Sequence, residues 1–208
     1  GNSILDKLDS AVKENSTGTF LYINAHGVNL SQKHSWFKQF LNQSTVTYAD
    51  GQGIRLASWL LGLPIPPLVN LTRWAWELLP YCEKKKYTIF ILGATETNIS
   101  RAVENIKKSM PHLSIVGFSH GYFKKQGSES DAIVEKINLL SPNVLIVGMG
   151  MTLQEKWILE NMIYGVDLND RNTIFSKIRL DPDNKYNLNI EAHDSLVFNF
   201  WKIQFDIV

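Results

Sequence analysis

The chain has 208 residues, of which 44% are apolar and 20% are charged, which predicts a folded domain with a substantial core and argues against disorder. Lys and Arg total 21 and Asp and Glu total 20, so the net charge is +1, which argues against a general nucleic-acid binder. A single cysteine, Cys82, excludes an intramolecular disulfide and indicates a reducing compartment. Residues 56–69 are the most apolar stretch, but three prolines interrupt it, so neither a membrane-spanning helix nor a signal peptide is predicted.

The first half of the chain predicts helices and strands in alternation. Apolar residues at helical spacing indicate helices, and short runs rich in β-branched and aromatic residues indicate strands. The expected elements are a helix over residues 3–15, a strand over 19–25, a helix over 31–41, a strand over 45–49, and helices over 53–61 and 70–81.

The second half alternates more regularly. Strands are predicted over residues 87–92, 113–118 and 143–147, and helices over 97–110, 128–140 and 152–163. Strands that alternate with helices of this length indicate βαβ units, and unbroken apolar strands fit a sheet covered on both faces. The sequence therefore predicts an α/β fold, a Rossmann-like, doubly wound and mostly parallel sheet with helices on both faces. Its ligand site should lie past the carboxyl ends of the strands.

The composition changes after about residue 165. Asp, Asn and Lys dominate residues 167–189, and residues 195–208 are rich in Val, Ile, Phe and Trp. We therefore divide the chain into a Rossmann-like domain over residues 1–165 and a C-terminal segment over residues 166–208 that packs on the domain or extends it. The pattern leaves open whether residues 195–208 form a strand or a helix. Their apolar residues would suit self-association into a homo-oligomer or membrane contact.

A glycine pair, Gly148 and Gly150, separates a predicted strand from a predicted helix. Small residues there allow the backbone to approach a ligand, and the helix start offers N–H groups to a phosphate. Thr152 and Glu155 fit a capping box at that start. A tight turn without a ligand explains the glycines equally well. The segment matches neither the dinucleotide fingerprint nor a Walker A loop, so NAD and ATP are poorly supported.

Three polar or aromatic residues follow other predicted strands, and each has two readings. Asp50 can act as a general base or can cap a turn, and the second role is commoner for an Asp-Gly pair. Tyr122 can stack on a base ring or pack in the core. Asn24 can point into the crevice or satisfy loop backbone.

Metal binding is not predicted. The histidines show no zinc-site spacing, and Asp181 and Asp183 lie in a polar loop rather than after an apolar strand.

Five short motifs in a fixed order give a more specific signal. They are Ile23-Asn24-Ala25, Tyr48-Ala49-Asp50-Gly51-Gln52-Gly53, Phe90-Ile91-Leu92-Gly93, Gly121-Tyr122-Phe123 after Ile115-Val116-Gly117, and Gly148-Met149-Gly150 with Gln154-Glu155-Lys156-Trp157. In this order and spacing they resemble the WecG/TagA/CpsF family of bacterial glycosyltransferases, and the resemblance covers about residues 4–163.

The resemblance implies an enzyme and its substrates. Such an enzyme is an inverting transferase that moves a sugar, N-acetylmannosamine or another hexose, from a UDP-sugar donor to a polyprenyl-diphosphate-linked saccharide. Its products feed cell-surface polysaccharide or teichoic-acid synthesis. The resemblance also implies a cytoplasmic protein, peripheral on the inner face of the membrane. No metal or other cofactor is implied, because the family does not depend on a D-x-D site.

The resemblance also assigns roles to residues. Asp50 is the expected catalytic base, Tyr122 is expected near the uracil, Gln154 is expected to hold donor or acceptor, and Asn24 is expected to line the same crevice. The other expected substrate-binding residues are Gly51, Gly93, Gly121, Gly148, Gly150, Glu155 and Arg73.

The sequence departs from the family pattern at several places. Tyr22 stands where threonine is usual, and Leu68 stands where an arginine is usual, with Arg73 nearby as a replacement. Thr152 and Leu153 replace the usual proline and lysine, and the family's Arg-rich C-terminal appendage is not recognisable. These departures keep a second hypothesis open, a protein of the same fold that binds a nucleotide-sugar without turnover.

Overall fold

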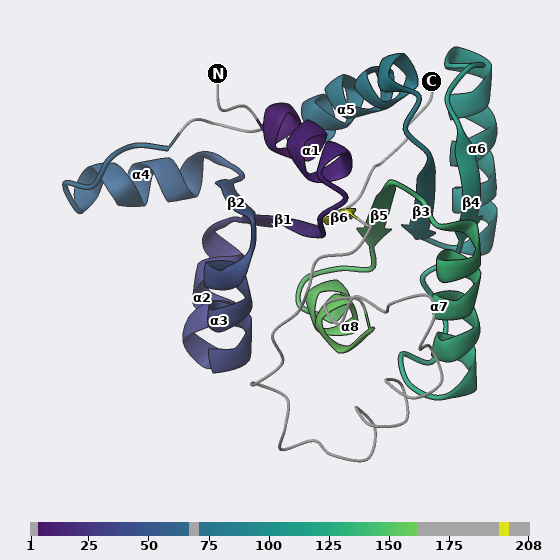
Figure 1. Cartoon of the computed structure of the whole chain (residues 1–208). Helices are drawn as coiled ribbons and strands as arrows, with labels where there is room; N and C mark the ends of the chain where they lie inside the picture. The colour runs from purple at the N-terminus through teal and green to yellow at the C-terminus, as the bar shows by residue number, and fades with distance from the viewer. Residues whose placement is uncertain (1–3, 67–70, 162–195, 200–208) are drawn as a thin grey trace.

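A computed structural model of the chain describes residues 4–66, 71–161 and 196–199 (Figure 1). In these residues it has eight helices and six strands. They are α1 (Ile4–Lys13), β1 (Gly18–Ile23), α2 (Ala25–Lys33), α3 (Ser35–Gln43), β2 (Val46–Ala49), α4 (Gln52–Leu60), α5 (Leu71–Lys85), β3 (Ile89–Gly93), α6 (Glu96–Ser109), β4 (Ile115–Ser119), α7 (Ser128–Leu140), β5 (Val144–Gly148), α8 (Leu153–Asn161) and β6 (Leu196–Asn199).

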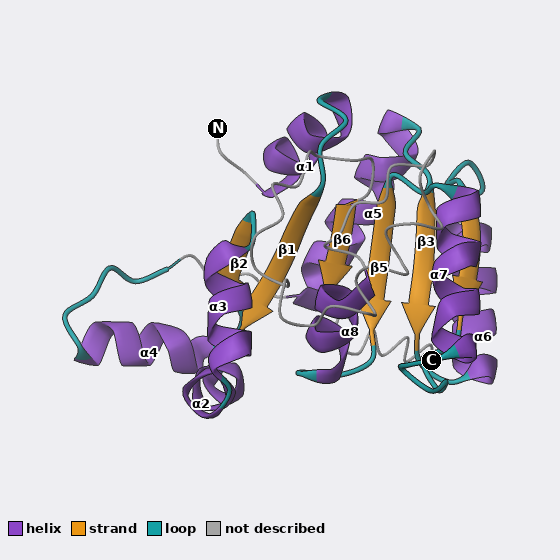
Figure 2. Ribbon diagram, turned by 60° about the horizontal axis from the view of Figure 1, so that its bottom comes forward, coloured by secondary structure: helices purple, strands orange, loops and turns teal. Residues whose placement is uncertain are grey.

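The strands form a single parallel sheet in the order β2-β1-β6-β5-β3-β4 (Figure 2). Gly93 at the end of β3 is in register with Gly148 at the end of β5, and Ile23 is in register with Ala49 at the ends of β1 and β2. Because all strands run in one direction, their carboxyl ends meet at one edge of the sheet. The Rossmann-like, doubly wound fold predicted from the sequence is confirmed.

Two apolar cores lie on opposite faces of the sheet. Helices α1, α5 and α6 cover one face, and α3, α7 and α8 cover the other. Strand β3 shows how one segment serves both cores, since Ile89 and Ile91 face the first and Phe90 and Leu92 face the second. Successive strand residues point to opposite faces, so a strand buried on both sides must be apolar throughout. This explains the unbroken apolar runs in the sequence.

The main error in the predicted elements lies between β1 and β2. One helix was expected over residues 31–41, whereas the structure has two, α2 and α3, separated at His34, which adopts extended backbone angles (φ −125°, ψ 100°). The first strand ends at Ile23 because the Asn24 side chain accepts a hydrogen bond from the Gly27 amide at 2.9 Å and begins α2. Helix α2 buries only Gly27 and Ser31, so it carries almost no apolar periodicity to detect.

The C-terminal segment contributes one described strand. Residues 196–199 form β6, which lies between β1 and β5 and pairs with both. For these four residues the strand alternative is confirmed and the helix alternative is wrong. The proposed boundary at residue 165 stays a prediction, because it lies outside the described residues.

Candidate functional site at the carboxyl edge of the sheet

A cleft of about 1460 Å³ lies at the carboxyl ends of β3, β4 and β5. Five of the residues predicted to bind substrate line it: Gly93, Gly121, Tyr122, Gly148 and Gly150. The amino end of α6 also lines it, through Thr95 and Asn98. This position agrees with the general rule that open parallel sheets bind ligands where their strands end.

The strand ends in this cleft are in backbone contact, which is why they are glycine. Gly93 has a φ of +153°, and a Cβ there would overlap the carbonyl group of Gly148. A Cβ on Gly121 would lie 3.1 Å from the Gly93 Cα and 3.0 Å from the Met149 Cγ. Two hydrogen bonds join the same segments, from the Ala94 amide to the Gly148 carbonyl (3.3 Å) and from the Gly121 amide to the Ala94 carbonyl (2.9 Å). The close contact leaves no room for side chains between the strand ends.

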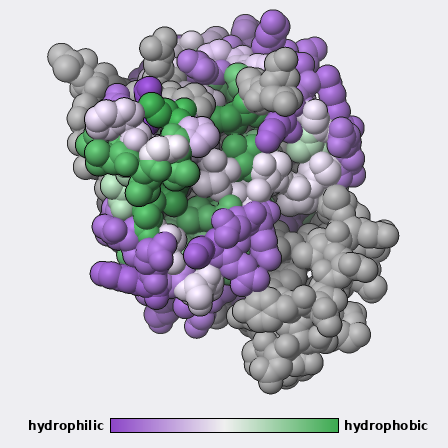
Figure 3. Space-filling model, turned by 90° about the vertical axis from the view of Figure 1, so that its left-hand side faces the viewer, coloured by the Kyte–Doolittle hydropathy of each residue, from purple (hydrophilic) through white to green (hydrophobic). Residues whose placement is uncertain are grey.

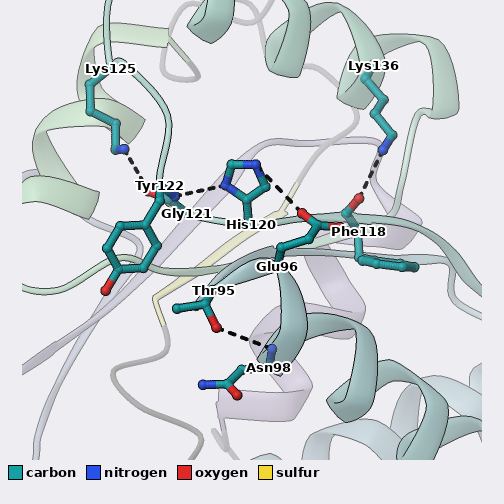
Figure 4. A network of polar contacts seen from close by, with 9 residues as sticks. All are labelled: Thr95, Glu96, Asn98, Phe118, His120, Gly121, Tyr122, Lys125 and Lys136. Atoms are coloured by element: carbon teal, nitrogen blue, oxygen red, sulfur yellow. Dashed lines mark hydrogen bonds and ion pairs between the residues drawn. The ribbon is translucent and has the colours of Figure 1, made fainter.

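Tyr122 projects from a loop that is fixed on both sides (Figure 4). Its amide donates a hydrogen bond to His120 Nδ1 at 3.1 Å, and His120 Nε2 lies 3.6 Å from Glu96. The Lys125 ammonium group donates to the carbonyls of Gly121 (2.7 Å) and Phe123 (2.6 Å). The Tyr122 side chain is 75% exposed, so it is not a core residue and its ring is accessible at the cleft.

Charged residues of both signs line the cleft, including the carboxylates of Glu104 and Glu129. Arg101, Lys108, Lys124 and Lys125 are among its lining residues. Lys124 is 3.7 Å from Glu129, and Lys108 is 2.7 Å from Glu104. Burial lowers the pKa of Lys125, because desolvation disfavours the charged form of its amino group.

Gln154 and Glu155 lie beneath the cleft rather than in it. Both are buried, with 0% and 1% exposure. Gln154 Oε1 accepts hydrogen bonds from the amides of Met149 and Gly150, both at 3.1 Å, and Gln154 Nε2 donates to Glu155 Oε1 at 2.9 Å. The predicted capping box is therefore wrong, because the Glu155 carboxylate faces Gln154 in the core instead of folding back to Thr152. Gln154 secures the loop after β5 from below.

The second oxygen of Glu155 is buried without a hydrogen-bond partner among the described residues, and so is the Tyr22 hydroxyl. Burial raises the pKa of Glu155 to about 7. Burial also raises the pKa of Tyr22 far above its usual range, and the charges of Glu155 and Asp50 add to this. The sequence singled out Tyr22 only as a departure from a family pattern.

Asp50, Gly51 and Asn24 lie at the same edge of the sheet but do not line this cleft. Asp50 is half-buried after β2, and its amide donates to the Ile23 carbonyl at 2.9 Å. Gly51, with a φ of +87°, is the N-cap residue immediately before α4. The Asn24 side chain accepts from the Gly27 amide and caps α2, which is the backbone role among the two left open for it, and its expected role in lining the crevice stays a prediction.

Close contacts connect this second group to the loop after β5. A Cβ on Gly53 would lie 3.2 Å from the Ala25 Cβ, and a Cβ on Gly27 would lie 3.1 Å from the Met151 sulfur. The start of α4 thus packs on the start of α2, which packs on the loop that Gln154 secures. Arg73 lies in the first turn of α5, with its side chain outside the described part, and Leu68 lies outside the described residues.

Several residues that shape the cleft were not predicted. Thr95 accepts a hydrogen bond from the Asn98 amide at 3.3 Å and caps α6, and a T-x-x-N pattern after a strand could have indicated this. Arg101 and Lys125 carry no such signal, because they reach the cleft only through the packing of α6 and the loop after β4.

The described residues hold no group of three or more His, Cys, Asp or Glu side chains arranged for a metal ion. Asp181 and Asp183 lie outside them. In the same part of the structure, no helix is both long and apolar enough to cross a bilayer.

The parallel sheet and the glycine-lined cleft at its carboxyl edge define a Rossmann-like α/β protein with a candidate ligand site past β3, β4 and β5. Residues 1–166 match the sequence profile of the Glycosyl transferase WecG/TagA/CpsF family, and the chain belongs to that family.

Two similar proteins come from Staphylococcus aureus strains NCTC 8325 / PS 47 and MRSA252. Both are named N-acetylglucosaminyldiphosphoundecaprenol N-acetyl-beta-D-mannosaminyltransferase. Each is 27% identical over 158 residues, which are 75% of this chain and 61% of the relative. The match thus spans less than two thirds of these relatives.

Substituting Gly93 by alanine tests the backbone contact between β3 and β5. We expect Gly93→Ala to lower the free energy of unfolding by about 3 kcal/mol, because its Cβ overlaps the Gly148 carbonyl group. Gly51→Ala is the matched control, since Gly51 also has a positive φ but its Cβ would meet no atom within 4 Å. It should cost only the backbone strain of these angles, roughly 1–2 kcal/mol. Urea denaturation measures the free energy of unfolding of both variants. Equal losses in the two variants would contradict a close backbone contact at Gly93.

Replacing Glu155 by glutamine tests its raised pKa. Glutamine keeps an oxygen for Gln154 Nε2 but cannot ionise. In the wild type the folded state retains the Glu155 proton up to about pH 7, whereas the unfolded state releases it near pH 4.5. Stability should therefore fall as the pH rises through this range, by about 3 kcal/mol relative to Glu155→Gln. Denaturation of both proteins at several pH values measures the difference, and parallel curves would exclude it.

Proposed function

We propose that this protein transfers a sugar from a UDP-sugar to a lipid-linked saccharide, with inversion at the anomeric carbon. The observation that carries the proposal is the cleft past β3, β4 and β5, with its glycine strand ends and the exposed ring of Tyr122. Membership of the glycosyl transferase family supports the reaction class, and the names of the relatives support the substrates.

The cleft suits a nucleoside diphosphate. The ring of Tyr122 offers a stacking surface for uracil at one side. The amino end of α6 lies beside it, and a helix amino end favours an anion. Arg101 and Lys124, which also line the cleft, add positive charge for the diphosphate as negative charge develops on it.

Asp50 is the proposed base. The acceptor hydroxyl oxygen would attack the anomeric carbon and form the new glycosidic bond, while the bond from that carbon to the diphosphate oxygen breaks. The UDP leaves with the bonding electron pair, and Asp50 takes the proton of the hydroxyl group. Asp50 is half-buried and lies at the same edge of the sheet as the cleft, which fits a base that approaches the donor from the acceptor side.

The relatives point to the acceptor and the donor sugar. Their name specifies N-acetylglucosaminyldiphosphoundecaprenol as acceptor and N-acetylmannosamine as the sugar moved. We propose the same pair for this chain, in the synthesis of a cell-envelope polymer. An undecaprenol carrier resides in a membrane, so the enzyme would work as a peripheral protein on the cytoplasmic face.

Replacing Asp50 by asparagine tests the proposed base. We expect Asp50→Asn to lower kcat on the order of 100- to 10,000-fold, because asparagine cannot accept the proton. Binding of UDP, measured by calorimetry, should be unchanged because Asp50 does not line the cleft. The assay follows labelled N-acetylmannosamine from its UDP donor into the lipid acceptor.

Asp6→Asn, an exposed substitution on α1, is the matched control and should keep full activity. Unchanged turnover in Asp50→Asn would remove Asp50 as base. Binding of UDP by the wild type without any transfer would instead support the alternative, a nucleotide-sugar-binding protein without turnover.

We also propose that transfer needs no metal ion. Cations and the amino end of α6 would take the place of a metal at the diphosphate. The rate should therefore be the same with EDTA as with added Mg²⁺ or Mn²⁺. A loss of activity in EDTA that either ion restores would overturn this proposal.

A further inference from the structure

Helix α4 and the segment after it carry an exposed apolar surface. We call it the α4 surface, and it consists of Leu56, Trp59, Leu60, Leu61, Leu63 and Ile65. These six side chains are between 49% and 71% exposed. No residue from 51 to 66 is buried, so α4 adds nothing to either core.

The geometry places these side chains together. Leu56, Trp59 and Leu60 follow the spacing of one helix face. The chain then turns through hydrogen bonds from the Gly62 amide to the Trp59 carbonyl (3.1 Å) and from the Leu63 amide to the Ser58 carbonyl (2.8 Å). After this turn Ile65 lies beside Gln52, Gly53 and Leu56, where the four residues line a common pocket with Arg55. Helix α4 projects from the body in Figures 1 and 2, and Figure 3 shows green hydrophobic residues gathered on that side of the molecule.

The charge of this region has one sign. From Gly51 to Trp76 the sequence contains no Asp or Glu, and its charged residues are Arg55 and Arg73. An apolar surface bordered by arginine and free of acidic groups complements an anionic lipid surface. Trp59 fits this partner too, because tryptophan favours the interface between lipid and water.

We propose that the α4 surface docks on an anionic lipid bilayer. The choice of a bilayer rests on the proposed function, in which the acceptor is lipid-linked. Helix α4 begins two residues after Asp50, so docking there would hold the proposed base close to the membrane plane. The diphosphate of the acceptor lies at that plane, since its polyprenyl chain is embedded in the bilayer.

Vesicle co-sedimentation tests the proposal. The full chain should sediment with vesicles of phosphatidylglycerol and phosphatidylcholine in equal parts, and less with phosphatidylcholine alone. Leu60→Glu should weaken the binding to the anionic vesicles by about tenfold or more, because it replaces an inserted apolar group by a repelled charge. Arg55→Gln should weaken it less and reduce its dependence on salt.

Leu139→Glu is the matched control, because Leu139 is 79% exposed on α7, outside the α4 surface. It should bind vesicles like the wild type. Circular dichroism should show the same thermal unfolding for both variants, since neither side chain is in a core. Equal vesicle binding by Leu60→Glu and Leu139→Glu would overturn the proposal.

A second copy of the chain is the alternative partner that could cover the α4 surface in place of a bilayer. If Leu60→Glu converts a dimer into a monomer in sedimentation velocity and leaves vesicle binding unchanged, the α4 surface is a subunit interface and the proposal fails. The assay is also independent of catalysis, since Asp50→Asn should bind vesicles normally. If the wild-type chain binds vesicles normally but transfers no sugar, the result counts against the proposed function alone.

Discussion

The arrangement of the site depends on the backbone contact between the ends of β3 and β5. Gly93 and Gly148 are in register, and there is no space for a side chain between them. Gly121, in the loop after β4, packs on the Gly93 Cα. Side chains at these positions would separate the strand ends and displace the loops that follow them. The contact therefore fixes where the Tyr122 loop and the Gly150 loop begin, and with them the shape of the cleft.

The second half of the fold could be predicted from the sequence almost completely, and the first half less well. Strands such as β3 are buried on both faces, so their residues are apolar without interruption and the pattern is clear. Helix α7 was predicted with its observed bounds. Helix α2 escaped detection because it buries two small residues and depends on a single capping side chain, Asn24. Helix periodicity cannot show an element that contributes so little to a core.

The candidate site was predictable only in part, for a different reason. The glycines and Tyr122 follow strands directly, and the sheet topology alone brings them together. Gln154 and Glu155 were identified by a motif, but their burial depends on how α8 packs, and the sequence suggested a surface cap instead. The burial of Tyr22, which raises its pKa, could not have been read from spacing or composition either, because it depends on how β1 packs in the sheet.

The hydrogen bonds of Gln154 determine which groups remain for a ligand. The amides of Met149 and Gly150 both point inward to its side-chain oxygen. A glycine-rich loop between a strand and a helix commonly presents such amides to a phosphate. In this protein both amides already donate to Gln154, so they are not available to a ligand. The loop can still contribute to the shape of the cleft. In the proposed function, the diphosphate would then be held mainly by the amino end of α6 and the side chains around it. The occupied amides distinguish this loop from a phosphate-binding loop of similar appearance.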